Sequence, residues 1–279
     1  LTAKAEANQP LPRGDVEAVV ADLRRYARLP RRHHDRALSL ILLEVSKIAP
    51  NIPTFPGIIR WVGIDGLCAE DWQYQKRDNH EYAPIATRVA RALAKWAKEH
   101  PDARPDDLEL ASQWLERARG GAKGDDALWL DWDSTLLFRR LGRREQASKA
   151  LAGVLAMKKH EFWVWAEAAH LYEPDRPELA IACACRALEC TTDPSYPVNV
   201  HTHLATMLAD REELAQASRE APLAAEIRNK KGWKIDPPLQ ALLDSCWYDP
   251  TYAGADAPQA YYARHSPQAL VLCYDGLQN

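Results

Sequence analysis

A short aromatic segment in the middle of this 279-residue chain occurs twice at a fixed spacing. Trp129-Leu-Asp-Trp132 returns as Phe162-Trp-Val-Trp165, and the offset from 129 to 162 equals the offset from 132 to 165. Each copy is followed by a turn and then by a run of small residues, at 146–155 and at 179–188. A fixed period with two helix-like segments per copy indicates stacked helical hairpins, because each hairpin leaves an apolar face that the next one covers.

The spacing is close to the period of about 34 residues that is typical of tetratricopeptide arrays. It predicts an all-α fold, an α-solenoid of stacked antiparallel helical hairpins that follows a helical N-terminal region. The predicted helices of the array are 127–141, 144–157, 161–172 and 177–190, with a weaker third pair at 197–208 and 211–223. The large side chains expected to fill the repeat core, opposite the small residues, are Trp129, Trp132, Phe162 and Trp165.

Composition shifts and breakers divide the chain into four predicted segments. They are a flexible tail (1–13), an N-terminal helical region (14–120), the tetratricopeptide-like array (125–225) and an irregular C-terminal segment with a capping helix (226–279). No alternating pattern of useful length predicts a β-strand.

Helix signals place the elements within these segments. Asp15 is the expected N-cap of a first helix, and a second helix, at about 33–48, has apolar residues around most of its circumference and should be buried on several sides. We expect a short helix at 71–75 and a long one between Pro84 and His100. Asp106 and Asp107 should open the next helix. Residues 229–258 are rich in Pro and Gly, so we expect them to be irregular. Ser266-Pro267 predicts the start of the final helix.

Composition excludes several classes of protein. The net charge of −3 gives no overall attraction to nucleic acid or to an acidic membrane, and no apolar run approaches the roughly 20 residues of a membrane span. Six scattered cysteines are too few for a disulfide scaffold and favour a reducing compartment. The first residues lack the apolar segment of a signal peptide, so we expect a cytoplasmic protein with no membrane association.

Motifs for catalysis and metal binding are missing from the sequence: it has no nucleotide-binding glycine loop, nucleophile elbow or zinc-protease motif. The expectation is therefore no enzyme, no catalytic residue and no cofactor. Cys183 and Cys185 point about 200° apart on a helix, so buried small residues are the better reading than a metal site.

Other polar candidates have equally plain explanations. His201 and His203 also diverge on a helix, His170 has no accompanying nucleophile, and the Asp131/Asp133 pair reads as a solvated helix face. No metal site is expected.

The strongest charged feature is a run of six arginines between positions 24 and 36, interspersed with His33 and His34. Guanidinium groups hold phosphate or carboxylate oxygens in pairs, so the run is a candidate partner- or phosphate-binding site. The alternative is a solvated helix end whose basic last turn complements the helix dipole. The six residues are Arg24, Arg25, Arg28, Arg31, Arg32 and Arg36.

Two tryptophan-rich stretches carry a resemblance to a known family. The first is 59–72, leading into 90–96, and the second is 158–165 together with 182–190. Together they resemble the tetratricopeptide-like proteins encoded in predicted bacterial conflict (defence) operons of the TOTE type, over about residues 35–275. The resemblance implies an all-helical array; in the family a small β-barrel nucleic-acid-binding domain can follow it, and we expect that domain to be absent from these 279 residues. The resemblance implies no catalytic motif.

The expected function is that of a protein-interaction scaffold or adaptor in a bacterial defence system, with protein partners encoded in the same operon. The repeats predict the scaffold, and the resemblance implies the defence context. One alternative is a nucleic-acid-associated binding module that uses the N-terminal arginines. Another is an enzyme without a recognisable motif.

Overall fold

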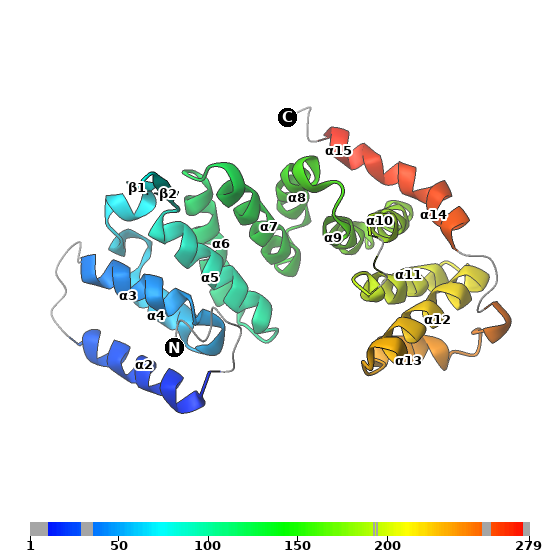
Figure 1. Cartoon of the computed structure of the whole chain (residues 1–279), viewed down its shortest axis with the longest axis horizontal. Helices are drawn as coiled ribbons and strands as arrows, with labels where there is room; N and C mark the ends of the chain where they lie inside the picture. Colours follow the sequence, from blue (N-terminus) through cyan, green and yellow to red (C-terminus); the bar gives the residue numbers. More distant parts are fainter. Residues whose placement is uncertain (1–10, 29–35, 192, 194, 253–257, 276–279) are drawn as a thin grey trace. The chain divides into compact units, whose positions relative to one another are not determined.

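The computed structural model describes residues 11–28, 36–191, 193, 195–252 and 258–275. The chain is built almost entirely from helices, which confirms the predicted all-α class (Figure 1). It divides into two compact units, Leu1–Ala150 and Leu151–Asn279, and each is described by itself. The division falls inside helix α8 (Arg144–Lys158), within the range predicted for the repeat array.

Helix α5 lies at the centre of the first unit, where it packs against α3, α6 and α7 and also contacts α4. Trp114, Leu115 and Leu93 are fully buried in this core. The described helices are α2 (Arg13–Tyr26), α3 (Arg36–Ser46), α4 (Phe55–Val62), α5 (Ile85–Glu99), α6 (Pro105–Arg119) and α7 (Gly124–Arg140). Short 3₁₀ turns at Ala49–Asn51, Ile64–Gly66 and Ala69–Trp72 connect some of them.

Two expectations for the first helices were wrong. Asp15 is not an N-cap, because α2 already begins at Arg13 after Pro12, and Asp15 lies in its first turn. Helix α3 buries Leu38, Leu42 and Val45, which share one face, but leaves Ala37 and Leu40 exposed, so it is buried on one side and not on several.

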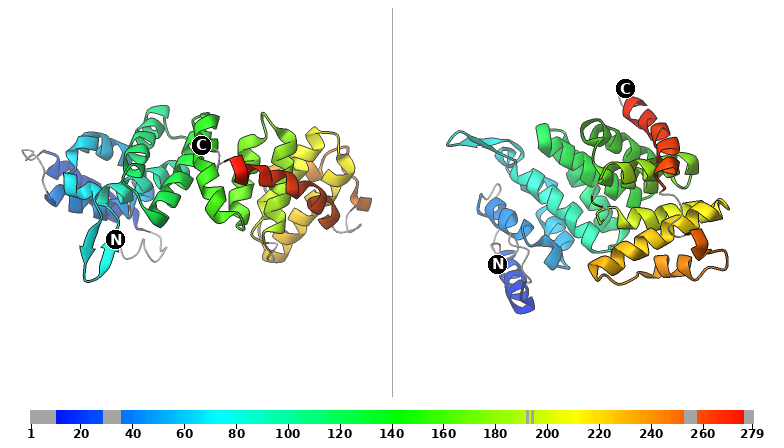
Figure 2. Two further views of the ribbon diagram at one scale, coloured as in Figure 1. Left: turned by 90° about the horizontal axis from the view of Figure 1, so that it is seen from above. Right: turned by 45° about the vertical axis from the view of Figure 1, so that its right-hand side comes forward.

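A small β-hairpin begins at Gln75, the last residue of the short helix expected at 71–75; the helical part of that range is the end of the 3₁₀ turn Ala69–Trp72. Strand β1 (Gln75–Arg77) pairs antiparallel with β2 (His80–Tyr82), with Gln75 opposite Tyr82. Asp78 and Asn79 both have positive φ, as a two-residue type I′ turn requires. The hairpin projects from the helices of its unit (Figure 2). The prediction of no strand is therefore corrected at this place.

Carboxylates of α7 tie this helix to its neighbours. Asp131 receives two hydrogen bonds from Arg119 of α6, at 2.6 and 3.0 Å, and Asp133 receives one from Arg91 of α5 at 2.9 Å. Burial raises the pKa of Asp133, although Arg91 opposes the shift. The expectation of a solvated acidic face is thus wrong, since both side chains are only partly exposed and ion-paired.

Asp107 anchors the start of α6 and predicts a pH dependence of stability. Arg104 donates to it at 2.9 and 3.1 Å and Arg60 at 2.6 Å; these contacts, against the opposing effect of burial, hold the pKa of Asp107 below its ordinary value. A depressed folded-state pKa contributes stability that is fully present above the unfolded-state pKa of about 4. This stability is lost as the pH falls from there through the depressed folded-state pKa.

Substitution of Asp107 by asparagine should therefore cost stability at pH 7, and the difference from the wild type should shrink as the pH falls from about 5 to 2. Thermal unfolding across this range measures it. The control is Asp65→Asn, because Asp65 pairs with Arg117 but is 85% exposed. A difference from the wild type that stays constant across the range would contradict the prediction.

In the second unit, helices α9 to α12 pack in chain order. Helix α9 packs against α10, α10 against α11, and α11 against α12. The described helices are α9 (Phe162–Tyr172), α10 (Pro177–Glu189), α11 (Val198–Asp210), α12 (Leu214–Lys231), α13 (Pro237–Leu243), α14 (Gln259–His265) and α15 (Val271–Asp275). The array helices predicted from the sequence are found close to their expected bounds, except that α12 runs from Leu214 to Lys231 where 211–223 was expected.

Small residues on α10 allow this close packing. Ala180, Ala184 and Ala187 are fully buried, as are Cys183 and Cys185. Burial raises the pKa of both thiols, so they remain protonated at neutral pH.

The four predicted core aromatics differ in burial. Trp165 is fully buried, whereas Trp129, Trp132 and Phe162 are only half-buried. The aromatic positions of the two copies therefore do not have identical surroundings.

The C-terminal segment is more helical than expected. Helix α13 begins at Pro237, where the Asp236 side chain accepts a hydrogen bond from the Leu239 N–H at 3.2 Å. Ser266 is not an N-cap, because helix α14 already runs from Gln259 to His265 and Ser266 continues with helical angles. Helix α14 and the following 3₁₀ turn (Ser266–Leu270) pack on α10. Within the described residues, no helix has the length and apolarity needed to cross a bilayer.

Candidate functional site

The predicted arginine site is only partly within the described residues. Arg24, Arg25 and Arg28 lie exposed at the end of α2, and Arg25 pairs with Asp22 at 3.2 Å. Arg31 and Arg32, like His33 and His34, lie outside the described residues.

Arg36 has a structural partner. Its guanidinium donates to Asp71 at 2.6 Å, and Asp71 is fully buried. The same carboxylate accepts from the Ser39 hydroxyl and from the Cys68 backbone N–H at 3.0 Å. Arg36 therefore balances a buried charge and fixes α3 to the 3₁₀ turn at Ala69–Trp72, which is a different role from binding a phosphate.

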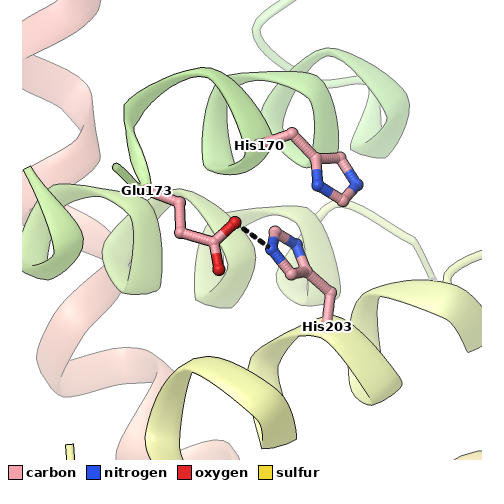
Figure 3. Close-up of side chains that lie close together, drawn as sticks. All are labelled: His170, Glu173 and His203. Carbon is pink, nitrogen blue, oxygen red and sulfur yellow. Dashed lines mark hydrogen bonds and ion pairs between the residues drawn. The ribbon is translucent and has the colours of Figure 1, made fainter. Parts of the chain in front are cut away.

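A second cluster, in the other unit, brings together residues that no sequence motif had grouped. His170 lies in the last turn of α9, Glu173 is the residue that caps this helix, and His203 lies in the middle of α11. Figure 3 shows the three side chains converging from the two helices. We call them the His–Glu cluster.

Contacts within the His–Glu cluster are close. His203 Nε2 lies 2.9 Å from Glu173 Oε2, and the two imidazole rings stack with centroids 3.9 Å apart and planes inclined by 16°. The side chain of His203 is 13% exposed and that of Glu173 is 35% exposed, while His170 is open to solvent. The cluster is therefore partly desolvated on one side and accessible on the other.

The donor atoms of the His–Glu cluster suit a metal ion. One donor atom from each residue lies within 4.8 Å of the other two. Two imidazoles and one carboxylate make a ligand set that zinc and other first-row transition metals use. The residues present thus fit a metal, although the sequence predicted none.

One signal in the sequence could have revealed this cluster. His170 and His203 are separated by the same interval as Trp129 and Phe162 of the aromatic repeat, so they occupy matching positions on the first helices of consecutive pairs. Comparison of His203 with its neighbour His201 alone does not show this relation to His170. His201 and His203 do point to different sides of α11, since His201 Nδ1 contacts Glu220 at 2.9 Å.

Comparison with known proteins gives one family. A family model described as a domain of unknown function, DUF7017, matches residues 128–269. No curated protein matches the chain. The matched segment is just over half of the chain and contains the His–Glu cluster. The chain therefore belongs to the DUF7017 family.

Proposed function

We propose that this chain is a protein-interaction scaffold, a tetratricopeptide-like α-solenoid that binds protein partners in a bacterial defence system. The observation that carries the proposal is the order of packing in the second unit, where α9, α10, α11 and α12 each contact the next helix along the chain. Nearest-neighbour packing of this kind is the property that makes repeat arrays extended binding surfaces.

A recurring turn favours the same reading. At the end of α7 the Arg143 N–H donates to the Phe138 carbonyl, and at the end of α11 the Glu213 N–H donates to the Leu208 carbonyl. The residue before each donor has positive φ, 72° at Gly142 and 63° at Glu212. Both are Schellman motifs, so the same type of turn closes the first helix of two pairs, α7–α8 and α11–α12, at an interval four residues longer than two 33-residue periods.

A candidate contact residue follows α12. Trp233 is 46% exposed, and tryptophan is enriched among the residues that dominate the energy of protein interfaces. We propose that it belongs to the docking surface of the scaffold. The defence context and the partner, a protein encoded in the same operon, rest on the family resemblance of the tryptophan-rich stretches.

Co-expression with the proteins of neighbouring genes, followed by nuclease treatment and purification, tests this function. The expected result is a stoichiometric complex that survives nuclease, with affinity at least about tenfold lower for Trp233→Ala. Leu40→Ala removes an exposed apolar side chain in the other unit and should leave the affinity unchanged. A complex that nuclease removes would favour the nucleic-acid alternative, and unchanged affinity of Trp233→Ala would contradict the proposed surface.

A further inference from the structure

We propose that His170, Glu173 and His203 form a binding site for one divalent transition-metal ion of the zinc class, which links the first helices of two consecutive pairs. The proposal does not depend on the scaffold function. It rests on the identity of the three donors, on their distances, and on their place at the end of a helix.

The donor set selects the class of ion. Imidazole nitrogens favour zinc, nickel, cobalt and iron(II), whereas calcium and magnesium prefer sites made of oxygen atoms alone. Three protein ligands leave at least one coordination position for water or for another ligand, as in open zinc sites. The exposure of His170 places this open position toward solvent.

The contact between His203 and Glu173 already has a suitable separation. Zinc lies about 2 Å from both imidazole nitrogen and carboxylate oxygen. A nitrogen and an oxygen 2.9 Å apart, as His203 Nε2 and Glu173 Oε2 are, then subtend an angle of about 90° at the ion. An ion bound to both atoms would lie about 45° off the line that joins them, so the two groups keep their separation while the imidazole turns to aim its lone pair at the ion.

His170 would complete the site through a larger adjustment. The rings of His170 and His203 are stacked with centroids 3.9 Å apart and planes inclined by 16°, so their in-plane nitrogen lone pairs run nearly parallel, and the ring of His170 must turn toward the ion. This ring is the exposed member of the cluster, and its motion does not require the core to open.

The backbone adds a favourable field. His170 and Glu173 lie in the last turn and at the cap of α9, and the C-terminal end of a helix carries a partial negative charge that attracts cations. His170 and Glu173 also follow the i, i+3 spacing that places two side chains on the same face of a helix. The cluster thus combines two ligands from one helix end with a third from the neighbouring pair.

Titration of the full chain with Zn²⁺ by isothermal calorimetry tests the site, after removal of any affinity tag and of bound metal by a chelator. All variants carry Cys246→Ser, because Cys246 is an exposed thiol that could bind zinc by itself. The expected result is one equivalent bound with micromolar or tighter affinity. Co²⁺ in place of Zn²⁺ should give visible absorption without the intense near-ultraviolet band of thiolate ligation.

Two substitutions separate ligation from simple packing. His170→Ala should weaken Zn²⁺ binding at least about tenfold, and so should Glu173→Gln, whose amide oxygen still accepts from His203 but is a poor metal ligand. The matched control is His160→Ala, which removes an exposed imidazole shortly before α9 and should leave the affinity unchanged. Failure to bind one equivalent, or equal affinity in wild type, His170→Ala and Glu173→Gln, would overturn the proposal.

Discussion

Replacement of Glu220 by leucine is expected to lower the free energy of unfolding of the second unit by about 3–5 kcal/mol, because three buried donor residues lose their acceptor at about 1–3 kcal/mol each. Glu220 is fully buried on α12 and joins three elements of this unit. Gln216 donates to it at 3.0 Å, Tyr262 of α14 at 2.8 and 2.9 Å, and His201 Nδ1 of α11 lies 2.9 Å away.

The size of the effect follows from what remains after the substitution. Leucine accepts no hydrogen bond, so the donors of Gln216, Tyr262 and His201 would lose a partner in a place that water does not reach. Burial and the neighbouring carboxylate of Glu220 raise the pKa of the Tyr262 hydroxyl, so Tyr262 remains a donor throughout the neutral range. Urea unfolding measures the change in the free energy of unfolding. Hydrogen exchange of the α12 backbone amides shows whether the second unit is the one that is destabilised.

A graded control distinguishes the network from packing alone. Tyr262→Phe removes one donor and keeps the ring, so it should cost only about 1–2 kcal/mol. Equal stability of Glu220→Leu and the wild type, or a larger loss for Tyr262→Phe than for Glu220→Leu, would show that Glu220 is not the centre of the network.

Replacement of Trp165 by alanine is expected to cost about 3–5 kcal/mol, the usual range for deleting a buried aromatic side chain. Trp165 is fully buried, and its indole N–H donates to the Lys159 carbonyl at 2.8 Å. The substitution opens a cavity in the second unit and leaves this carbonyl only the weak contact from the Cys190 thiol at 3.8 Å, so both effects act in the same direction.

Trp233 provides the matched control in the same unit. It is also a tryptophan but is 46% exposed, so its replacement by alanine should change stability by less than about 1 kcal/mol. Urea unfolding of both variants gives the comparison. If Trp165→Ala were no less stable than Trp233→Ala, the aromatic repeat would not mark the core of the second unit.

Helices α5 to α11 could be predicted because their signals are local. The aromatic repeat, the small-residue runs and the prolines placed α9 to α11 close to their observed bounds, whereas α12 runs eight residues beyond its expected end. The strands β1 and β2 could not be found from alternation, because such short strands are too brief to show a period of two. Asp78-Asn79 was the available turn signal, and Asp236-Pro237 was the corresponding start signal for α13.

The roles of polar side chains were predicted less well. Arg36, Asp131 and Asp133 were all judged from their own helices, yet each has a partner on another segment. Arg140 is a similar case, since its guanidinium donates to the carbonyls of Ala97, His100 and Pro101 at the end of α5. A charge pattern along one helix shows that a surface is polar, but it does not show which group on another segment will pair with each charged side chain.

The amino-acid sequence alone determined where α5 to α11 form and that they follow one another as pairs, because helix periodicity, caps and breakers act over a few residues. Only the tertiary structure decided that Glu220 collects three donors and that His170, Glu173 and His203 meet. Such contacts depend on how α9, α11, α12 and α14 are oriented against one another, and that orientation results from the packing of the whole second unit.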